Sequence, residues 1–141
     1  MKTICVAALA LCASLLVSSS LFAASAENDV EAAYSAWDAA FNKGDAKAVA
    51  AFYTSDALLL PPTHELIKGP AGVEKFFAGL FANGITAHKL ELIEAIVSGD
   101  NIVGAAKWSV KLKDGKEGGG IATHVFQKSG GSLKLKLHTF N

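Results

Sequence analysis

The chain contains no arginine, and both of its cysteines lie within the first twelve residues. Without arginine there are no planar, forked cations for bidentate recognition of phosphates or carboxylates. The 13 lysines are balanced by 13 acidic residues, so we do not expect nucleic-acid binding, which relies on a basic excess. Because Cys5 and Cys12 supply all the thiols, the chain beyond them can form no disulfide and offers no cysteine nucleophile or soft-metal ligand.

The first 26 residues have the pattern of a secretory signal peptide. Lys2 gives a positive start, residues 4–17 are mostly apolar, and small residues lead to Ala-Ser-Ala at 24–26. We therefore expect residues 1–26 to be removed on export to the periplasm or the medium, leaving no stable membrane anchor.

Two other interpretations of this segment fit less well. A membrane-spanning helix needs about 20 apolar residues, and the strongly apolar core here is shorter. A lipid anchor on Cys12 would require a small residue before it, where the chain has Leu11. Cleavage after Ala26 leaves residues 27–141, which suffice for one domain with its own core but not for two.

Apolar spacing predicts three helices in the first half of this domain. The first begins at the N-cap candidate Asn28 and ends at 42–44, where Gly44 can adopt the left-handed cap conformation. The second is short, is capped by Asp45, and turns Val49, Phe52 and Tyr53 inward. The third spans 69–83 and has Pro near its start and a strongly apolar face.

The remaining segments have the patterns of strands. Turn residues at 54–56 precede a short buried strand at 57–60, which is ended by two prolines, and 63–68 can return as a brief arm. From Ile85 onward apolar residues recur at every second position, as in β-strands, and turn residues separate these long runs. Strands of this length in a small sheet twist and curve, and the three helices can fill the concave side. We therefore expect an α+β fold whose curved antiparallel sheet wraps the three helices. The runs are 85–97, 102–113, 119–127 and 133–140.

The order of these elements resembles that of the nuclear transport factor 2-like (NTF2-like) superfamily. Residues 37–45, 52–62, 69–70 and 138–141 are similar to the SnoaL-like, ketosteroid-isomerase-like branch. The resemblance covers 28–141 and implies a cystatin-like cone of curved antiparallel sheet around three N-terminal helices. It also implies a pocket between sheet and helices, and frequently a homodimer formed through the outer face of the sheet.

The positions that correspond to the catalytic residues of ketosteroid isomerase hold other residue types in this chain. The catalytic tyrosine position falls on Trp37, the base position on Pro61, and the later acid near Ala122 or Thr123. None of these side chains can ionise to take those roles. We therefore do not expect ketosteroid-isomerase chemistry, and since the family includes many proteins that only bind or associate, the site must be argued from its residues.

His124 is the best candidate for a catalytic residue. In related association domains a basic residue in this slot points into the pocket, although the alternation of 119–127 alone leaves open which face is concave. Its ordinary pKa suits a general base or a hydrogen-bond donor; the alternative is a histidine on a dimer face. We expect His64 and His88 to be solvated, and His138 to point outward with the lysines of the last strand.

The leucines at 133, 135 and 137 should face the core, which would carry Thr139 and Asn141 inward toward the mouth of the pocket. An acid–base enzyme would then require at least two of His124, Tyr53, Thr139 and Asn141 to lie within hydrogen-bond reach around a cavity.

The leading hypothesis is an exported, dimeric NTF2-like protein whose pocket either binds a small apolar or neutral molecule or is functionally vestigial. We expect no cofactor and no metal site. An acid–base lyase or isomerase and a homodimeric association module are the alternatives. Aromatic walls with few polar groups are typical of such a pocket. Its expected lining is Trp37, Phe41, Tyr53, Leu60, Phe77, Trp108, His124, Thr139 and Asn141.

Overall fold

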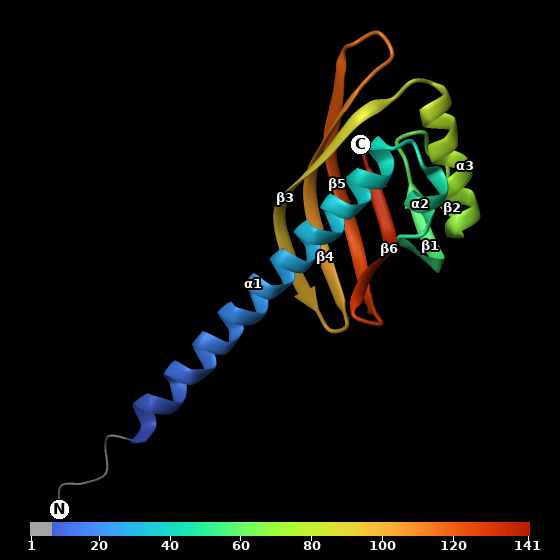
Figure 1. Ribbon diagram of the computed structural model, residues 1–141. Coiled ribbons are helices and arrows are strands. Elements are labelled where there is room, and N and C mark those ends of the chain that lie inside the picture. The colour runs from blue at the N-terminus through green and yellow to red at the C-terminus, as the bar shows by residue number, and fades with distance from the viewer. Residues whose placement is uncertain (1–6) are drawn as a thin grey trace, which may run out of the picture.

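The computed structural model describes the backbone of residues 7–141 and the side chains from residue 24 onward. Residues 1–6, including Lys2 and Cys5 of the predicted signal segment, lie outside the described part. Within that part, two helices, two strands and a third helix precede four long strands (Figure 1). Their bounds are α1 Ala7–Asn42, α2 Ala46–Ala50, β1 Tyr53–Leu60, β2 Ile67–Lys68, α3 Gly69–Ala82, β3 Thr86–Ser98, β4 Asn101–Lys111, β5 Glu117–Ser129 and β6 Ser132–Phe140.

The strands form one curved, unclosed sheet in the order β2-β1-β6-β5-β4-β3. All neighbours are antiparallel except β1 and β6, which run parallel. Helix α1 crosses one face of the sheet, and α3 lies beside β1 and β2 (Figure 1). The predicted α+β arrangement of curved sheet and helices is thereby confirmed.

Helix α1 is longer than the sequence predicted. It runs without interruption through Asn28, the expected cap, and ends at Asn42, two residues before Gly44 with φ of 71°. Residues 7–41 contain neither glycine nor proline, so no helix-breaking residue ends the helix earlier. The first part of α1 projects beyond the sheet (Figure 1). In the described part of the chain, no helix has both the length and the apolar character required to cross a bilayer.

Strand β1 begins earlier than predicted, because the expected turn at 54–56 is an irregularity within the strand. Thr54 Oγ1 donates to Asp56 Oδ1 at 2.8 Å, and the register with β6 shifts between Tyr53 and Leu58. Tyr53 is therefore a strand residue and not the end of the second helix. Leu60 was expected in the pocket but is 37% exposed, since the alternation that buries Leu59 turns it to the other face.

The predicted facing of the last strand is wrong after Leu135. Val125 pairs with Leu137 while Phe126 pairs with Leu135, so Lys136 is an extra residue that forms a β-bulge. A bulge exchanges the two faces for every residue beyond it. His138 is consequently buried on the inner face, and Thr139 points away from it.

Candidate functional site

A cavity of about 220 Å³ lies between α1, α3 and the inner face of the sheet. The side chains that form it are aromatic or aliphatic with few polar atoms, and two histidines are among them. Such a composition is typical of sites for small apolar molecules. The aromatic and histidine side chains of the lining are Trp37, Phe41, Phe76, Phe77, His88, Trp108, His138 and Phe140.

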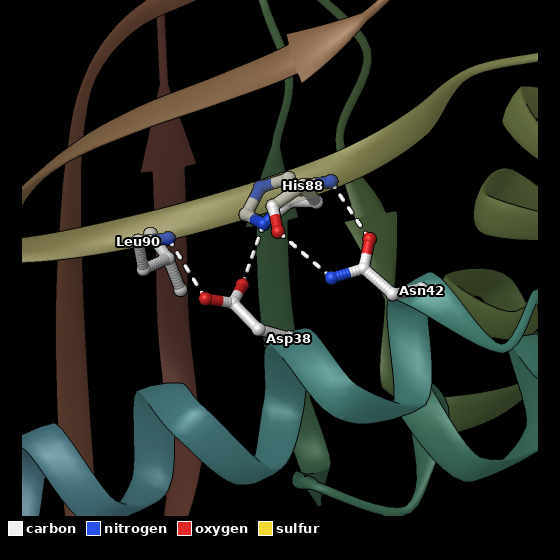
Figure 2. Close-up of polar contacts among 4 residues, drawn as sticks. All are labelled: Asp38, Asn42, His88 and Leu90. Atoms are coloured by element: carbon white, nitrogen blue, oxygen red, sulfur yellow. Dashed lines mark hydrogen bonds and ion pairs between the residues drawn. The ribbon is translucent and has the colours of Figure 1, made fainter.

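His88, one of the lining residues, forms a pair with Asp38 of α1 (Figure 2). Asp38 Oδ1 lies 2.6 Å from His88 Nδ1, and Asp38 Oδ2 accepts the backbone N–H of Leu90 at 2.8 Å. The two side chains are only 16% and 9% exposed. Since both carboxylate oxygens act as acceptors, His88 Nδ1 must donate, and Nε2 is the nitrogen left for other contacts.

A β-bulge in β3 places His88 on the inner face. The register against β4 shifts between Thr86 and Lys89, and Ala87 within the shift has φ of 53°. A left-handed conformation is unfavourable for alanine and persists only where neighbouring contacts enforce it. Asn42, one turn after Asp38 on α1, supplies such contacts: its amide accepts the N–H of His88 at 2.7 Å and donates to its C=O at 2.9 Å (Figure 2).

Aromatic rings surround His88 on the cavity side. Its ring centroid is 4.6 Å from that of Phe41 and 4.8 Å from that of Trp37, and its plane is nearly parallel to that of Trp108 at 6.5 Å. An imidazole held by a carboxylate in apolar surroundings can act as a hydrogen-bond acceptor or as a general base.

His138 is the second histidine of the lining, and its ring forms a hydrogen bond with the buried side chain of Tyr53. Tyr53 Oη lies 2.7 Å from His138 Nδ1. Burial raises the pKa of the Tyr53 hydroxyl, although the nearby Trp37 N–H opposes this rise. Trp37 Nε1 is buried and makes no hydrogen bond within the described residues. Burial lowers the pKa of His138 well below its ordinary value, with smaller contributions from His124 and His88.

His124 is sealed beneath the cavity and does not line it. Its ring centroid is 4.4 Å from that of His138, and its Nδ1 lies 2.9 Å from Tyr34 Oη. Burial, aided by His88, lowers the pKa of His124 to about 3. Gly104 makes this arrangement possible, because a Cβ there would come within 2.5 Å of Tyr34 Oη. His124 is therefore enclosed by protein and is not among the residues that line the cavity.

The structure brings together only part of the predicted site. Trp37, Phe41, Phe77 and Trp108 line the cavity, Tyr53 lies behind His138, and His124 lies beneath it. Leu60 and Thr139 are on the opposite face of the sheet, as described above.

Asn141 closes the end of the sheet and does not line the cavity. Its Oδ1 accepts the N–H of Ile121 at 3.1 Å, and its main-chain oxygen accepts Trp108 Nε1–H at 3.2 Å. No hydrogen bond of the described residues joins any two of His124, Tyr53, Thr139 and Asn141, so the acid–base site expected from the sequence is not formed.

Sequence reasoning missed Asp38, His88, His138 and Phe140. The spacing of Asp38 and Asn42 places two polar side chains one helical turn apart beside an aromatic stripe, and this was the available signal. The bulges that turn the two histidines inward have no comparable signature. Within the described residues, no group of three or more His, Cys, Asp or Glu side chains is arranged to hold a metal ion.

Comparison with known proteins identifies the fold and the family. The family model for the SnoaL-like domain matches residues 23–133. A search of curated proteins found no match.

Solved structures with the same fold share limited sequence identity with this chain. A Xanthomonas campestris protein described as a candidate calcium/calmodulin dependent protein kinase II association domain is 25% identical, with a TM-score of 0.62 over 79% of this chain and 83% of that one. A ketosteroid isomerase-like protein from Erwinia carotovora atroseptica is 23% identical, with a TM-score of 0.66 over 80% and 92%. An NTF-2 like protein of unknown function from Shewanella oneidensis MR-1 is 16% identical, with a TM-score of 0.69 over 81% and 97%. The chain therefore belongs to the SnoaL-like domain family, and its fold is NTF2-like.

Proposed function

We propose that the protein binds a small, mostly apolar, uncharged molecule in the cavity between α1, α3 and the sheet. The observation that carries this proposal is the cavity itself, whose walls are almost entirely aromatic and aliphatic. A cavity of about 150 Å³ accommodates benzene. The larger volume here, about 220 Å³, suits a substituted ring or a compact bicyclic skeleton.

Tryptophan fluorescence gives a direct test, because both tryptophans of the chain line the cavity. A ligand that enters it should change their emission, and native mass spectrometry of the purified protein should detect a small molecule that co-purifies. Ala122→Leu adds volume to the lining and should abolish binding. Thr123→Val, the next residue on the opposite face, is the matched control and should bind normally. Equal binding by both variants would contradict the proposed location.

An acid–base lyase or isomerase is the second candidate, and the Asp38–His88 pair at 2.6 Å favours it. A histidine that donates to a carboxylate is well oriented to take a proton from a bound carbon acid. Incubation with small enolisable ketones and hydroxyketones in D₂O, followed by NMR, would reveal catalysed exchange. His88→Gln should abolish such exchange. His124→Gln should retain it, because His124 lies outside the cavity; the reverse result would contradict the role of His88.

Export of the protein is part of the same proposal, on the pattern of residues 1–26. Expression with its own leader should yield a periplasmic or secreted protein whose N-terminus is Glu27. An unprocessed Met1 terminus in the cytoplasm would contradict it.

A homodimer, or a wider role in association, is proposed for the face of the sheet opposite α1. Apolar side chains form one row of cross-strand neighbours there, from Ile96 through Val103, Val125 and Leu137 to Leu58. Val125→Lys at the centre of the row should convert a dimer to a monomer in sedimentation experiments. Ser109→Lys, at the edge of the same face, is the control. A monomeric unmodified protein would remove the dimer from the proposal.

A further inference from the structure

We infer that the ligand is an alcohol or a phenol on an apolar skeleton, and that its O–H donates a hydrogen bond to His88 Nε2. This inference rests on the proposed binding function and adds the chemical class of the ligand. It assigns to His88 the role of acceptor and to Asp38 that of a positioning residue.

The hydrogen bonds of Asp38 determine which nitrogen of His88 is the acceptor. Leu90 N–H occupies one carboxylate oxygen, and the other lies 2.6 Å from His88 Nδ1. An ionised carboxylate has no proton to donate, so the hydrogen of this contact belongs to Nδ1. In the neutral ring Nε2 then carries the lone pair. Within the described part of the chain only Nδ1 of His88 makes a side-chain hydrogen bond, which leaves Nε2 for a donor on the ligand.

The remaining lining excludes charged ligands. No Lys, Arg, Asp or Glu is among the described side chains that form the cavity, so a carboxylate, phosphate or ammonium group would be buried there without a counter-ion. Burial of an unpaired charge is strongly unfavourable, whereas a hydroxyl is tolerated where it finds a partner. An uncharged donor therefore matches both the apolar walls and the exposed lone pair.

The position of His88 is fixed by hydrogen bonds to its backbone as well as to its side chain. Asn42 engages both backbone groups of His88, and the preceding Ala87 is kept in a left-handed conformation. These contacts fix the direction of the ring within the aromatic cage of Trp37, Phe41 and Trp108. A hydrogen-bond acceptor fixed in this way selects donors by geometry at little further cost in conformational entropy.

Calorimetric titration with 1-naphthol, 1-methoxynaphthalene and naphthalene tests the inference, since only naphthol can donate. At about pH 8, naphthol should bind about tenfold more tightly than the ether, the difference expected for one hydrogen bond. Equal or tighter binding of the ether, with naphthalene also bound, would overturn the inference and leave the apolar pocket intact. If none of the three binds, the proposed function fails as well.

Two variants separate the acceptor role from packing. His88→Phe keeps an aromatic ring and should bind naphthol and the ether equally. Asp38→Asn should reverse the tautomer, because the amide oxygen accepts Leu90 N–H and its NH₂ donates to Nδ1; Nε2 then becomes a donor, and the ether should bind at least as tightly as naphthol. His64→Gln, at an exposed loop position, is the control and should retain the original preference. An unchanged preference for naphthol in Asp38→Asn, with circular dichroism showing a folded protein, would contradict the tautomer argument.

Discussion

His88 and His124 both lie on the inner face of one sheet, yet their environments give them opposite properties. His88 is paired with a carboxylate and stands at the cavity wall, while His124 is paired with the Tyr34 hydroxyl and is 1% exposed. The carboxylate holds Nδ1–H of His88 and leaves Nε2 without a partner among the described side chains, whereas packed rings enclose His124. Chemistry is therefore expected in the region around His88, and rigidity in the region of His124 and His138. Each prediction below perturbs one region and leaves the other in place.

Acidification should have the largest effect, and it acts on the region of His124 and His138. Both have folded pKa values below the ordinary value of 6.5, that of His124 about 3. The unfolded chain therefore binds more protons than the folded one below about pH 6.5, and their contribution to stability is present above this pH and lost as pH falls. Between pH 7 and 5 the free energy of unfolding should decrease by about 2 kcal/mol through His124 alone, and His138 should add a further decrease of the same sign. Urea titrations at several pH values measure this.

A double variant, His124→Gln with His138→Gln, should flatten this pH dependence even where it is less stable overall. His64→Gln, at an exposed position, should retain the slope of the unmodified protein. A steep slope that survives in the double variant would place the titrating groups elsewhere.

Gly104→Val should have the next largest effect, because the new side chain would collide with Tyr34 and Val30 beneath His124. Overpacking of this kind costs about 3 kcal/mol of stability, measurable by urea denaturation. Gly79→Ala, in helix α3 where an added Cβ meets nothing within 4 Å, is the control and should be neutral or slightly stabilising. Equal stability of the two variants would mean that the interior around Tyr34 is loosely packed.

Asp38→Ala perturbs the region of His88 and should cost about 2 kcal/mol, since it leaves Leu90 N–H and His88 Nδ1 without their acceptor. Thermal denaturation provides the measurement. Asp29→Ala, at an exposed position of the same helix, should change stability little. A loss as small as that of the control would show that water replaces the carboxylate without cost.

Tyr34→Phe and Tyr53→Phe should have the smallest effects, about 1 kcal/mol each, because each removes one buried hydrogen bond to a histidine. Only Tyr53→Phe should also alter ligand affinity, because His138 lines the cavity and His124 does not. Equal changes in affinity for both variants would contradict the finding that His138 lines the cavity and His124 does not.

Local signals in the sequence predicted most of the architecture. Gly44, Asp45 and the helix start at 69–70 mark boundaries that the structure confirms, because caps and turns depend on neighbouring residues alone. The aromatic stripe of α1 also predicted Trp37 and Phe41 in the cavity wall.

The two histidines of the cavity wall face inward because of β-bulges in β3 and β6. No local sequence pattern predicts these bulges. The leucines at 133, 135 and 137 alternate perfectly, yet the bulge at Lys136 interrupts the faces between the second and the third. The shift near Ala87 similarly turns His88 inward. Bulges arise from the pairing of one strand with another, so the alternation within a single strand does not predict them.

The contacts of Asp38 and Asn42 with β3 have a consequence for how molecules of this protein meet one another. As the last strand on its side of the sheet, β3 has a free line of backbone donors and acceptors, and such edges promote aggregation when they are left open. The two side chains occupy the N–H and C=O of His88 and the N–H of Leu90. At the opposite edge β2 is only two residues long. The same helix that shapes the cavity thus obstructs the pairing of a further strand with β3 at residues 88–90.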